Sequence, residues 1–271
     1  MERLDSSRLD LLWQTILDAG AYATEKQKDI KRDYKADGSV LTETDLHISH
    51  MVLGRVKELF PDCNVISEEE TTGWTDAAPF TFILDPIDGT DVYSQGFPSF
   101  AIALGILNRQ RIPVGAMICC PRFGLGEPSL EVRLDPYEKL ILNGETITER
   151  KPERKVRQIM MTTHELWRYD FSTWCGKTRS FGSTIIHILL PAVAPEIDGA
   201  VSQACYAWDL SAAHAVLRYM GQDIIYADGT PLTYTDHMLI ERGKCRMSNF
   251  AGTPSAVKQL MEAIPTKYEE D

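Results

Sequence analysis

Three separate segments of the chain carry carboxylates that could act together on a phosphate group. Asp85 and Asp88 stand close together in one segment, Glu68 belongs to an acidic run upstream, and Asp209 lies far downstream. Carboxylate oxygens are the ligands that Mg²⁺ prefers, and a bound Mg²⁺ can activate water and hold a phosphate oxygen. Because residues that are distant in sequence can converge in space, these segments predict a divalent-metal site.

The segment Asp85–Thr90, with the sequence DPIDGT, is the main candidate for a metal-binding turn. The largely apolar residues 80–84 predict a buried strand that ends at Asp85, because the proline that follows has no N–H group to give a sheet. Gly89 lets the backbone approach a ligand closely, and Thr90 adds a hydroxyl group where main-chain N–H groups can converge. Taken alone, the same run is equally compatible with a surface turn.

Local patterns in the N-terminal half predict the elements that would position these acids. Asp5 can cap a helix that continues to Ala23, and Thr42 with Asp45 forms a capping box before a second helix at about 44–60. An acid at Asp45 would also stabilise the dipole of its helix. Further along, apolar stretches and a turn at 143–144 predict a largely antiparallel sheet, with strands at 100–107, 112–119, 130–133 and 139–142.

The C-terminal half is predicted to return to alternating strands and helices. Ser183 can cap a helix that runs to Leu190, where Pro191 ends or kinks it. Asp209 can cap another helix, which ends near Gly221. As an isolated residue Asp209 would be interpreted as a helix cap alone, so its metal-binding role depends on the acids elsewhere in the chain.

The order and spacing of four elements resemble the inositol monophosphatase family of magnesium-dependent, lithium-sensitive phosphatases. These elements are Asp45, the pair Glu68–Glu69, the DPIDGT segment and the segment WDLSAA at 208–213. The resemblance implies a layered α/β/α/β/α sugar-phosphatase fold with two intimately packed halves, a metal-binding half at 1–154 and a half at 155–271 that completes the active site. It also implies a homodimer that hydrolyses a small phosphomonoester with metal-activated water.

The same resemblance assigns the metal ligands. Two or three Mg²⁺ ions would be bound by the carboxylates of Glu68, Asp85, Asp88 and Asp209 and by the carbonyl oxygen of Ile87. Asp85 would bridge the first and second ions, and a third, weaker ion would lie near Glu68.

Catalytic and substrate-facing positions follow from the resemblance as well. Asp45 and Thr90 would act with Glu68 to orient the attacking water. In several branches of the family a loop like Lys35–Ser39 covers the metal site. The positions expected to contact the phosphate or the rest of the substrate are Gly89, Thr90, Ser183, Thr184 and Ser202.

The sequence leaves the substrate open. Inositol monophosphatases carry an acid about seven residues before the aspartate of the WD segment, but Ser202 stands there, followed by Gln203. The run D-G-S-x-x-T-E-x-D at 37–45 resembles branches that act on 3′-phosphoadenosine 5′-phosphate or histidinol phosphate. These substrates remain alternatives to inositol phosphate. A non-catalytic regulatory relative is a further alternative, which the acids retained at all four carboxylate positions disfavour.

Composition excludes several other classes of protein. The formal net charge is −11, with 28 Lys+Arg against 39 Asp+Glu, so the chain lacks the basic character of proteins that bind nucleic-acid polymers. No stretch reaches the roughly 20 apolar residues that span a bilayer, and the first residues lead into no signal-peptide core, so we expect a cytoplasmic protein without membrane contact. The six cysteines include no C-x-x-C pair and predict free thiols in a reducing compartment. Zinc spacing, a P-loop and a G-x-S-x-G segment are absent from the sequence.

Overall fold

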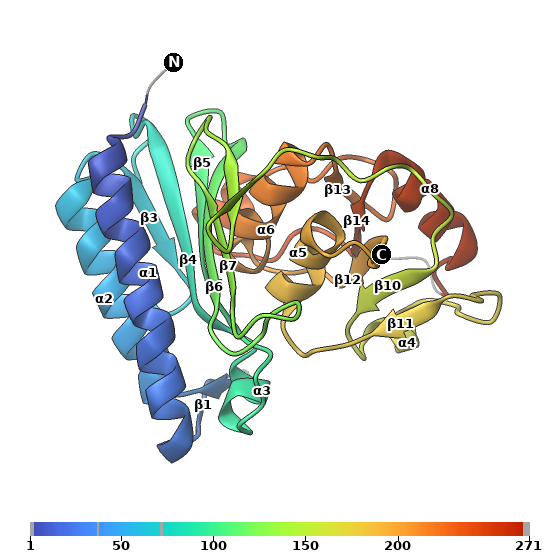
Figure 1. The fold of residues 1–271 in the computed structure, drawn as a ribbon, viewed down its shortest axis with the longest axis horizontal. Helices are drawn as coiled ribbons and strands as arrows, with labels where there is room; N and C mark the ends of the chain where they lie inside the picture. The colour runs from blue at the N-terminus through green and yellow to red at the C-terminus, as the bar shows by residue number, and fades with distance from the viewer. Residues whose placement is uncertain (1–2, 37, 71–72, 268–271) are drawn as a thin grey trace.

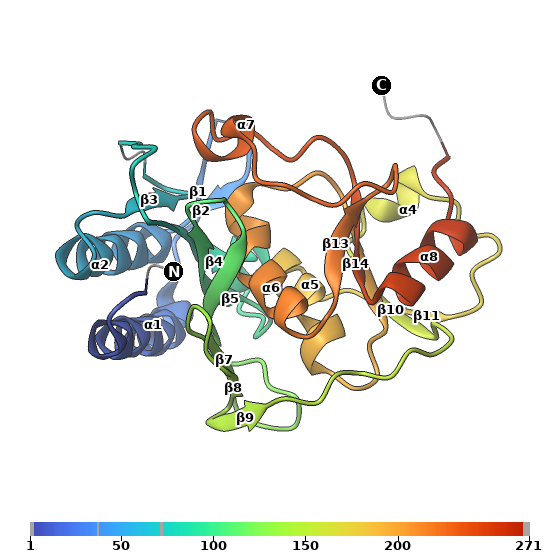
Figure 2. The same cartoon turned by 90° about the horizontal axis from the view of Figure 1, so that it is seen from above.

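A computed structural model describes residues 3–36, 38–70 and 73–267 of the chain. Within these ranges, helices and sheets alternate in five layers: a helix pair, a large sheet, a second helix pair, a smaller sheet and an outer helix (Figures 1 and 2). This order is the α/β/α/β/α arrangement predicted from the sequence. The predicted division at 154/155 falls between the last strand of the large sheet and the first strand of the smaller one. That the two parts are separate halves of the molecule stays a prediction.

The outer helix pair consists of α1 (Ser6–Lys26) and α2 (Glu43–Leu59), which lie side by side against one face of the large sheet (Figure 1). Asp5 caps α1 through its side chain, and Thr42 with Asp45 forms the predicted capping box of α2. The apolar stripes of both helices are buried together with residues of the sheet. The chain between the two helices forms three short elements: η1 (Gln27–Asp29), β1 (Asp33–Tyr34) and β2 (Val40–Leu41).

The large sheet has seven strands among the described residues, in the order β3-β4-β5-β6-β7-β8-β9. Strands β3 and β4 are parallel and all other neighbours are antiparallel, which confirms the predicted sheet. Asn143 and Gly144 have the positive φ angles, 47° and 82°, that favour a two-residue hairpin turn. The strands are β3 (Asn64–Ser67), β4 (Phe80–Asp88), β5 (Ala101–Asn108), β6 (Pro113–Cys120), β7 (Leu130–Leu134), β8 (Leu140–Leu142) and β9 (Glu145–Ile147).

Strand β4 differs from the sequence-based prediction at its C-terminal end. The prediction that it ends at Asp85 is wrong, because β4 continues through Pro86 to Asp88. The register with β5 shifts between Asp85 and Asp88, so the proline, which has no N–H group, lies where the regular pairing is already interrupted. Both aspartates therefore belong to the end of one strand, and the short helix α3 (Thr90–Ser94) follows directly.

Helices α5 (Thr184–Val193) and α6 (Ala207–Tyr219) form the layer between the two sheets (Figure 1). Their apolar residues are buried in one cluster with residues from both sheets, so the two parts of the chain share a core. Ser183 caps α5 as predicted, but the helix does not end at Leu190; it continues past Pro191 to Val193.

The start of α6 also corrects the sequence analysis. Asp209 is not the N-cap residue, because the helix begins at Ala207 and Tyr206 occupies the cap. The Asp209 carboxylate accepts a hydrogen bond from the N–H of Tyr206 at 2.8 Å, as the third residue of a capping box does. Asp209 therefore stabilises the first turn from inside the helix.

The smaller sheet has five strands in the described part of the chain, in the order β11-β10-β12-β14-β13. Strand β10 is parallel to β11 and β12, whereas β14 is antiparallel to β12 and β13. The strands are β10 (Gln158–Met161), β11 (Lys177–Arg179), β12 (Gly199–Ser202), β13 (Asp223–Tyr226) and β14 (Asn249–Gly252). The remaining helices are α4 (Glu165–Arg168), α7 (Asp236–Leu239) and α8 (Pro254–Ala263), and α8 covers the outer face of this sheet (Figure 2).

Two general expectations can be compared with the fold. The six cysteines are free thiols, and Cys119, Cys120, Cys205 and Cys245 are buried. Across the ranges that the structure describes, no helix combines the length and the apolar character needed to cross a bilayer.

Candidate metal and phosphate site

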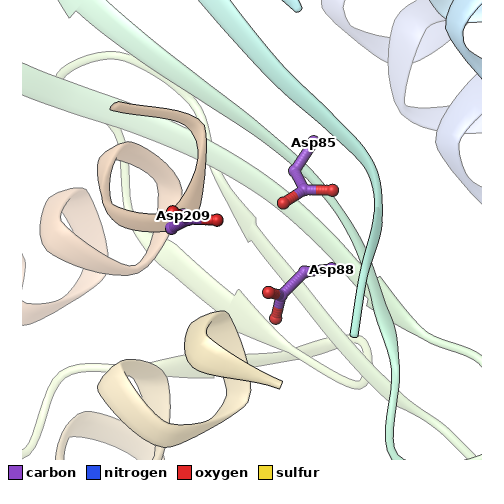
Figure 3. Close-up of side chains that lie close together, drawn as sticks. All are labelled: Asp85, Asp88 and Asp209. Carbon is purple, nitrogen blue, oxygen red and sulfur yellow. The ribbon is translucent and has the colours of Figure 1, made fainter. Parts of the chain in front are cut away.

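Three of the predicted metal ligands converge between the large sheet and the second helix pair (Figure 3). Asp85 and Asp88 come from the end of β4, and Asp209 comes from the first turn of α6. One carboxylate oxygen of each residue lies within 4.8 Å of the others. The structure thus brings together residues from both parts of the chain, while their role as metal ligands stays a prediction.

The environment of Asp85 is buried and strongly negative. Burial raises the pKa of its carboxyl group well above the ordinary value, and the charges of Glu68, Asp88 and Asp209 raise it further. Among the residues that the structure describes, none donates a hydrogen bond to the buried Oδ1 atom of Asp85. A buried carboxylate without donors or counter-charge is unfavourable. A divalent cation between the three carboxylates would supply the missing partner, so the residues present fit a metal ion.

Asp88 is held by the N-terminus of α5. The hydroxyl of Ser183 and the N–H of Ile185, the latter at 2.8 Å, donate to its Oδ2 atom, and the N–H of Thr184 donates to Oδ1 at 3.2 Å. Burial raises the pKa of Asp88 to about 6, and these hydrogen bonds limit the increase. Ser183 therefore contacts a predicted metal ligand in this structure. Its contact with the substrate stays a prediction.

Glu68 lies beside this group of three but outside the set whose ligand atoms all fall within 4.8 Å. Its N–H donates to the carbonyl oxygen of Leu84 at 3.2 Å, next to Asp85 on β4. Its carboxylate pairs at 2.6 Å with the ammonium of Lys35, which also pairs with Glu69 at 2.6 Å. Burial disfavours the charge of Lys35, but the two glutamates raise its pKa above the ordinary value. A cation bound by Glu68 would compete with Lys35.

The predicted covering loop Lys35–Ser39 lies at the same place. The N–H of Lys35 donates to the carbonyl oxygen of Ser39 at 2.8 Å, which closes the loop, and both residues line a cavity with Glu68 and Asp209. Asp37, part of the same loop, lies outside the described residues.

Asp45 and Thr90 contact each other through their side chains, while their role in orienting water stays a prediction. The hydroxyl of Thr90 lies 3.1 Å from Asp45 Oδ1 and 2.8 Å from the carbonyl oxygen of Ile87. Burial raises the pKa of Asp45 to about 7, although the hydroxyl and N–H of Thr42 hydrogen-bond its other oxygen. The Thr90 hydroxyl carries a single proton, which it donates to the carbonyl oxygen of Ile87 or to Asp45 Oδ1.

Gly89 is required by the close approach of two segments. Its φ angle is +86°, and an added Cβ atom would lie 3.1 Å from the carbonyl oxygen of Gly182 and 3.3 Å from Cβ of Ser183. A larger residue would therefore be strained by its backbone and would push away the loop that binds Asp88.

A cavity of about 500 Å³ opens beside the predicted metal ligands. Thr184, a predicted substrate contact, lines it together with Gln203 and Cys205. Ser202 is buried, and its hydroxyl lies 3.1 Å from the sulfur of Cys205. Gln203, Ala204 and Cys205, which follow Ser202 in the chain, line the cavity, but Ser202 itself does not. Contact between Ser202 and the substrate therefore stays a prediction.

Three cavity residues had no signal in the sequence: Tyr206, Arg242 and Lys244. The rings of Tyr206 and Trp208 stack at 4.6 Å between centroids. Arg242 lies over Trp208 and donates hydrogen bonds to the carbonyl oxygens of Glu68 and Glu70, while Lys244 lies over Tyr206. The loop after α7 carries no sequence motif, and only the folded chain places its residues Arg242 and Lys244 beside Glu68 and Asp209.

Comparison with known proteins agrees with this geometry. The model of the inositol monophosphatase family matches residues 9–262. The chain is 23% identical over 247 residues to Nus factor SuhB of Pasteurella multocida, which covers 89% of this chain and 88% of that protein. It is 27% identical over 222 residues to inositol monophosphatase 2 of Homo sapiens, with 77% and 75% covered. A LiCl-soaked inhibitory complex of Staphylococcal inositol monophosphatase-1 has a TM-score of 0.80 at 14% identity and covers 99% of this chain and 100% of its own.

Proposed function

Because the chain belongs to the inositol monophosphatase family, we propose that it hydrolyses a small phosphomonoester in a reaction that depends on Mg²⁺. The observation that carries the proposal is the group of Asp85, Asp88 and Asp209, whose ligand atoms lie within 4.8 Å of one another. Like charges this close repel one another strongly in a dry site, and divalent cations remove that repulsion. Glu68 and the carbonyl oxygen of Ile87 complete the proposed ligands for two or three ions.

The residues around the proposed ions orient the reaction. When bound, Mg²⁺ would lower the pKa of water and neutralise charge on the phosphate. Asp45 and Thr90, whose side chains lie 3.1 Å apart, hold the attacking water, and the Asp45 carboxylate can accept its proton. The backbone N–H groups of Gly89 and Thr90 hold phosphate oxygens. Thr184 lines the cavity where the rest of the substrate would enter, and the buried Ser202 would contact it next to Gln203, which also lines the cavity.

Inositol 1-phosphate is expected to be a poor substrate. Ser202 replaces the acid that would accept hydrogen bonds from sugar hydroxyls. Glu165, which contacts this segment, is already committed to the N–H of Gln203 at 2.7 Å and to the hydroxyl of Thr162. Hydrogen bonds to charged partners contribute roughly 1.5–3 kcal/mol against about 1 for neutral ones, so the loss corresponds to about tenfold. Nucleotide 3′-phosphates and histidinol phosphate are the alternative substrates.

A phosphate-release assay on a panel of phosphomonoesters tests this function. The panel contains inositol 1-phosphate, a nucleoside 3′-monophosphate, 3′-phosphoadenosine 5′-phosphate and histidinol phosphate, each with Mg²⁺ or with EDTA. We expect EDTA to abolish turnover and at least one other compound to exceed inositol 1-phosphate in kcat/KM. Inositol 1-phosphate as the best substrate would contradict the interpretation of Ser202.

No turnover on the whole panel would favour a non-catalytic regulatory role, which the name Nus factor of one relative makes the relevant alternative.

Two further properties are proposed from the family. Li⁺ should inhibit at a millimolar scale, and Ca²⁺ should inhibit because its larger, looser coordination shell misplaces the water. The protein should be a cytoplasmic homodimer, which light scattering on the purified chain and fractionation of cells would test.

A further inference from the structure

The cavity beside the metal ligands is larger than a phosphate group needs. Its volume is about 500 Å³, within the range of roughly 300–1,000 Å³ that is typical of sites for drug-sized ligands. Asp209 and Glu68 line one part of it, and the stacked rings of Tyr206 and Trp208 belong to its wall. A phosphoryl group at the acids would therefore leave room in the cavity, beside the rings, for the rest of the substrate.

Three cations line this cavity, and hydrogen bonds hold two of them, Lys35 and Arg242, in fixed positions. Lys35 is paired with Glu68 and Glu69 at 2.6 Å. Arg242 donates hydrogen bonds to the backbone carbonyl oxygens of Glu68 and Glu70, which holds its guanidinium in the wall. Lys35 would have to leave a glutamate to bind a substrate anion, whereas Arg242 is fixed in the wall by its two carbonyl partners and keeps further N–H donors.

Lys244 is the third cation, and its contacts differ. Its ammonium lies 5.2 Å from the centroid of the Tyr206 ring. Throughout the described ranges, no carboxylate forms an ion pair with it. An ammonium over an aromatic ring keeps donors that can turn toward a ligand in the same cavity.

We propose that Lys244 and Tyr206 form a subsite for a second anionic group, so that the preferred substrate is a phosphomonoester that also carries a phosphate or a carboxylate. This inference rests on the proposed function, because the scissile phosphate must lie at Asp85, Asp88 and Asp209. Lys244 then binds the second anion, and the ring of Tyr206 holds the ammonium in place. Lys244 is thus a specificity-determining residue.

Matched pairs of phosphomonoesters test the subsite. Glycerate 2-phosphate and glycerol 2-phosphate differ by a carboxylate, and a nucleoside 3′,5′-bisphosphate differs from its 3′-monophosphate by a phosphate. We expect kcat/KM to favour the compound with the extra anion by about tenfold in at least one pair, as for a hydrogen bond to a charged group. The pair that shows the preference distinguishes a carboxylate from a phosphate as the second anion.

Substitutions assign the preference to a residue. Lys244→Gln should bring the ratio within the pair close to one, chiefly through KM for the compound with the extra anion. Tyr206→Phe should keep the preference, whereas Tyr206→Leu should reduce it. The control is Lys258→Gln, an exposed lysine on α8, which should leave the ratio unchanged. Equal kcat/KM within both wild-type pairs, or a preference that survives Lys244→Gln, would overturn the proposal.

A binding measurement separates this inference from the proposed function. Titration calorimetry with Ca²⁺ in place of Mg²⁺ should give a lower Kd for the compound with the extra anion, and Lys244→Gln should remove the difference. If no compound is hydrolysed but this difference is found, the proposed function fails and the subsite stands. If wild-type protein binds both members of each pair equally or binds none, the subsite is rejected.

Discussion

The guanidinium of Arg242 donates a hydrogen bond to the backbone carbonyl oxygen of Glu68, 174 positions earlier in the chain, at 2.9 Å. A second bond from Arg242 reaches the carbonyl oxygen of Glu70, and the guanidinium lies over the ring of Trp208. These contacts attach the acidic run after β3 to the first turn of α6. They hold Glu68 beside Asp209, so the geometry of the site depends on a residue outside every sequence motif.

Replacement of Arg242 should therefore weaken metal binding without removing a ligand. We expect Arg242→Lys to raise the Mg²⁺ concentration at half-maximal activity by about tenfold, because a lysine cannot span both carbonyl oxygens and each lost hydrogen bond is worth about 1 kcal/mol. Activity measured against Mg²⁺ concentration checks this. Arg246→Lys, an exposed change that faces Asp228, is the control. An unchanged Mg²⁺ dependence in Arg242→Lys would show that Glu68 is positioned without it.

Asp85→Asn should uncouple stability from metal binding. Removal of a buried charge beside Glu68, Asp88 and Asp209 relieves repulsion, so the melting temperature without metal should stay equal or rise by roughly 2–4 °C. Turnover and the stabilisation by added Mg²⁺ should both be lost. Thermal unfolding with Mg²⁺ and with EDTA measures this. Asp62→Asn, at an exposed position, should behave like wild type. A clear loss of metal-free stability in Asp85→Asn alone would contradict the proposed repulsion.

Alanine substitutions at two glycines with similar φ angles can distinguish backbone strain from steric contact. Gly89 and Gly96 have φ angles of +86° and +84°, but an added Cβ meets Gly182 and Ser183 only at Gly89 and meets nothing within 4 Å at Gly96. Both alanine variants should lose about 1 kcal/mol of unfolding free energy from the left-handed conformation. Gly89→Ala alone should also lose most activity. Urea denaturation and kcat/KM measure the two effects, and similar activities in the two variants would rule out a steric role.

His187 predicts how stability depends on pH. Its Nε2 atom accepts the N–H of Phe181 at 2.8 Å, so the neutral form is the one that fits, and burial lowers its pKa to about 4. The unfolded chain, with a pKa near 6.5, binds this proton first as the pH falls. The contribution of neutral His187 to the free energy of unfolding is therefore fully present above about pH 6.5 and is lost progressively as the pH falls toward 4.

The change is measurable between pH 7 and pH 5. The lowered pKa of His187 corresponds to a loss of about 2 kcal/mol of unfolding free energy over this pH interval, at 1.36 kcal/mol per pKa unit. The variant His187→Gln keeps a hydrogen-bond acceptor but cannot titrate. Between pH 7 and pH 5 it should therefore lose about 2 kcal/mol less unfolding free energy than the wild-type protein does. Urea denaturation in EDTA at the two pH values gives the comparison. His237→Gln, at an exposed histidine, is the control, and an equal pH dependence in all three proteins would refute the prediction.

The elements that could be predicted from the sequence are those with local causes. Asp5, Thr42 and Ser183 cap helices through contacts within a few residues, and the two-residue turn at 143–144 needs φ angles that its own residues favour. The corrections concern places where distant contacts decide. Strand β4 continues past Pro86 because β5 pairs with Asp88, and α6 starts before Asp209 because Tyr206 closes the capping box.

The sequence by itself determined which carboxylates are present and their order along the chain, and it predicted the layered fold. Only the tertiary structure decided that Asp88 is bound by the N-terminus of α5, that Arg242 holds Glu68, and that Lys244 lies over Tyr206. The first two contacts join residues 97 and 174 positions apart. Neither leaves a periodic or local pattern in the sequence. They form because packing α5 and α6 between the two sheets brings the end of β4 and the loop after α7 to one place.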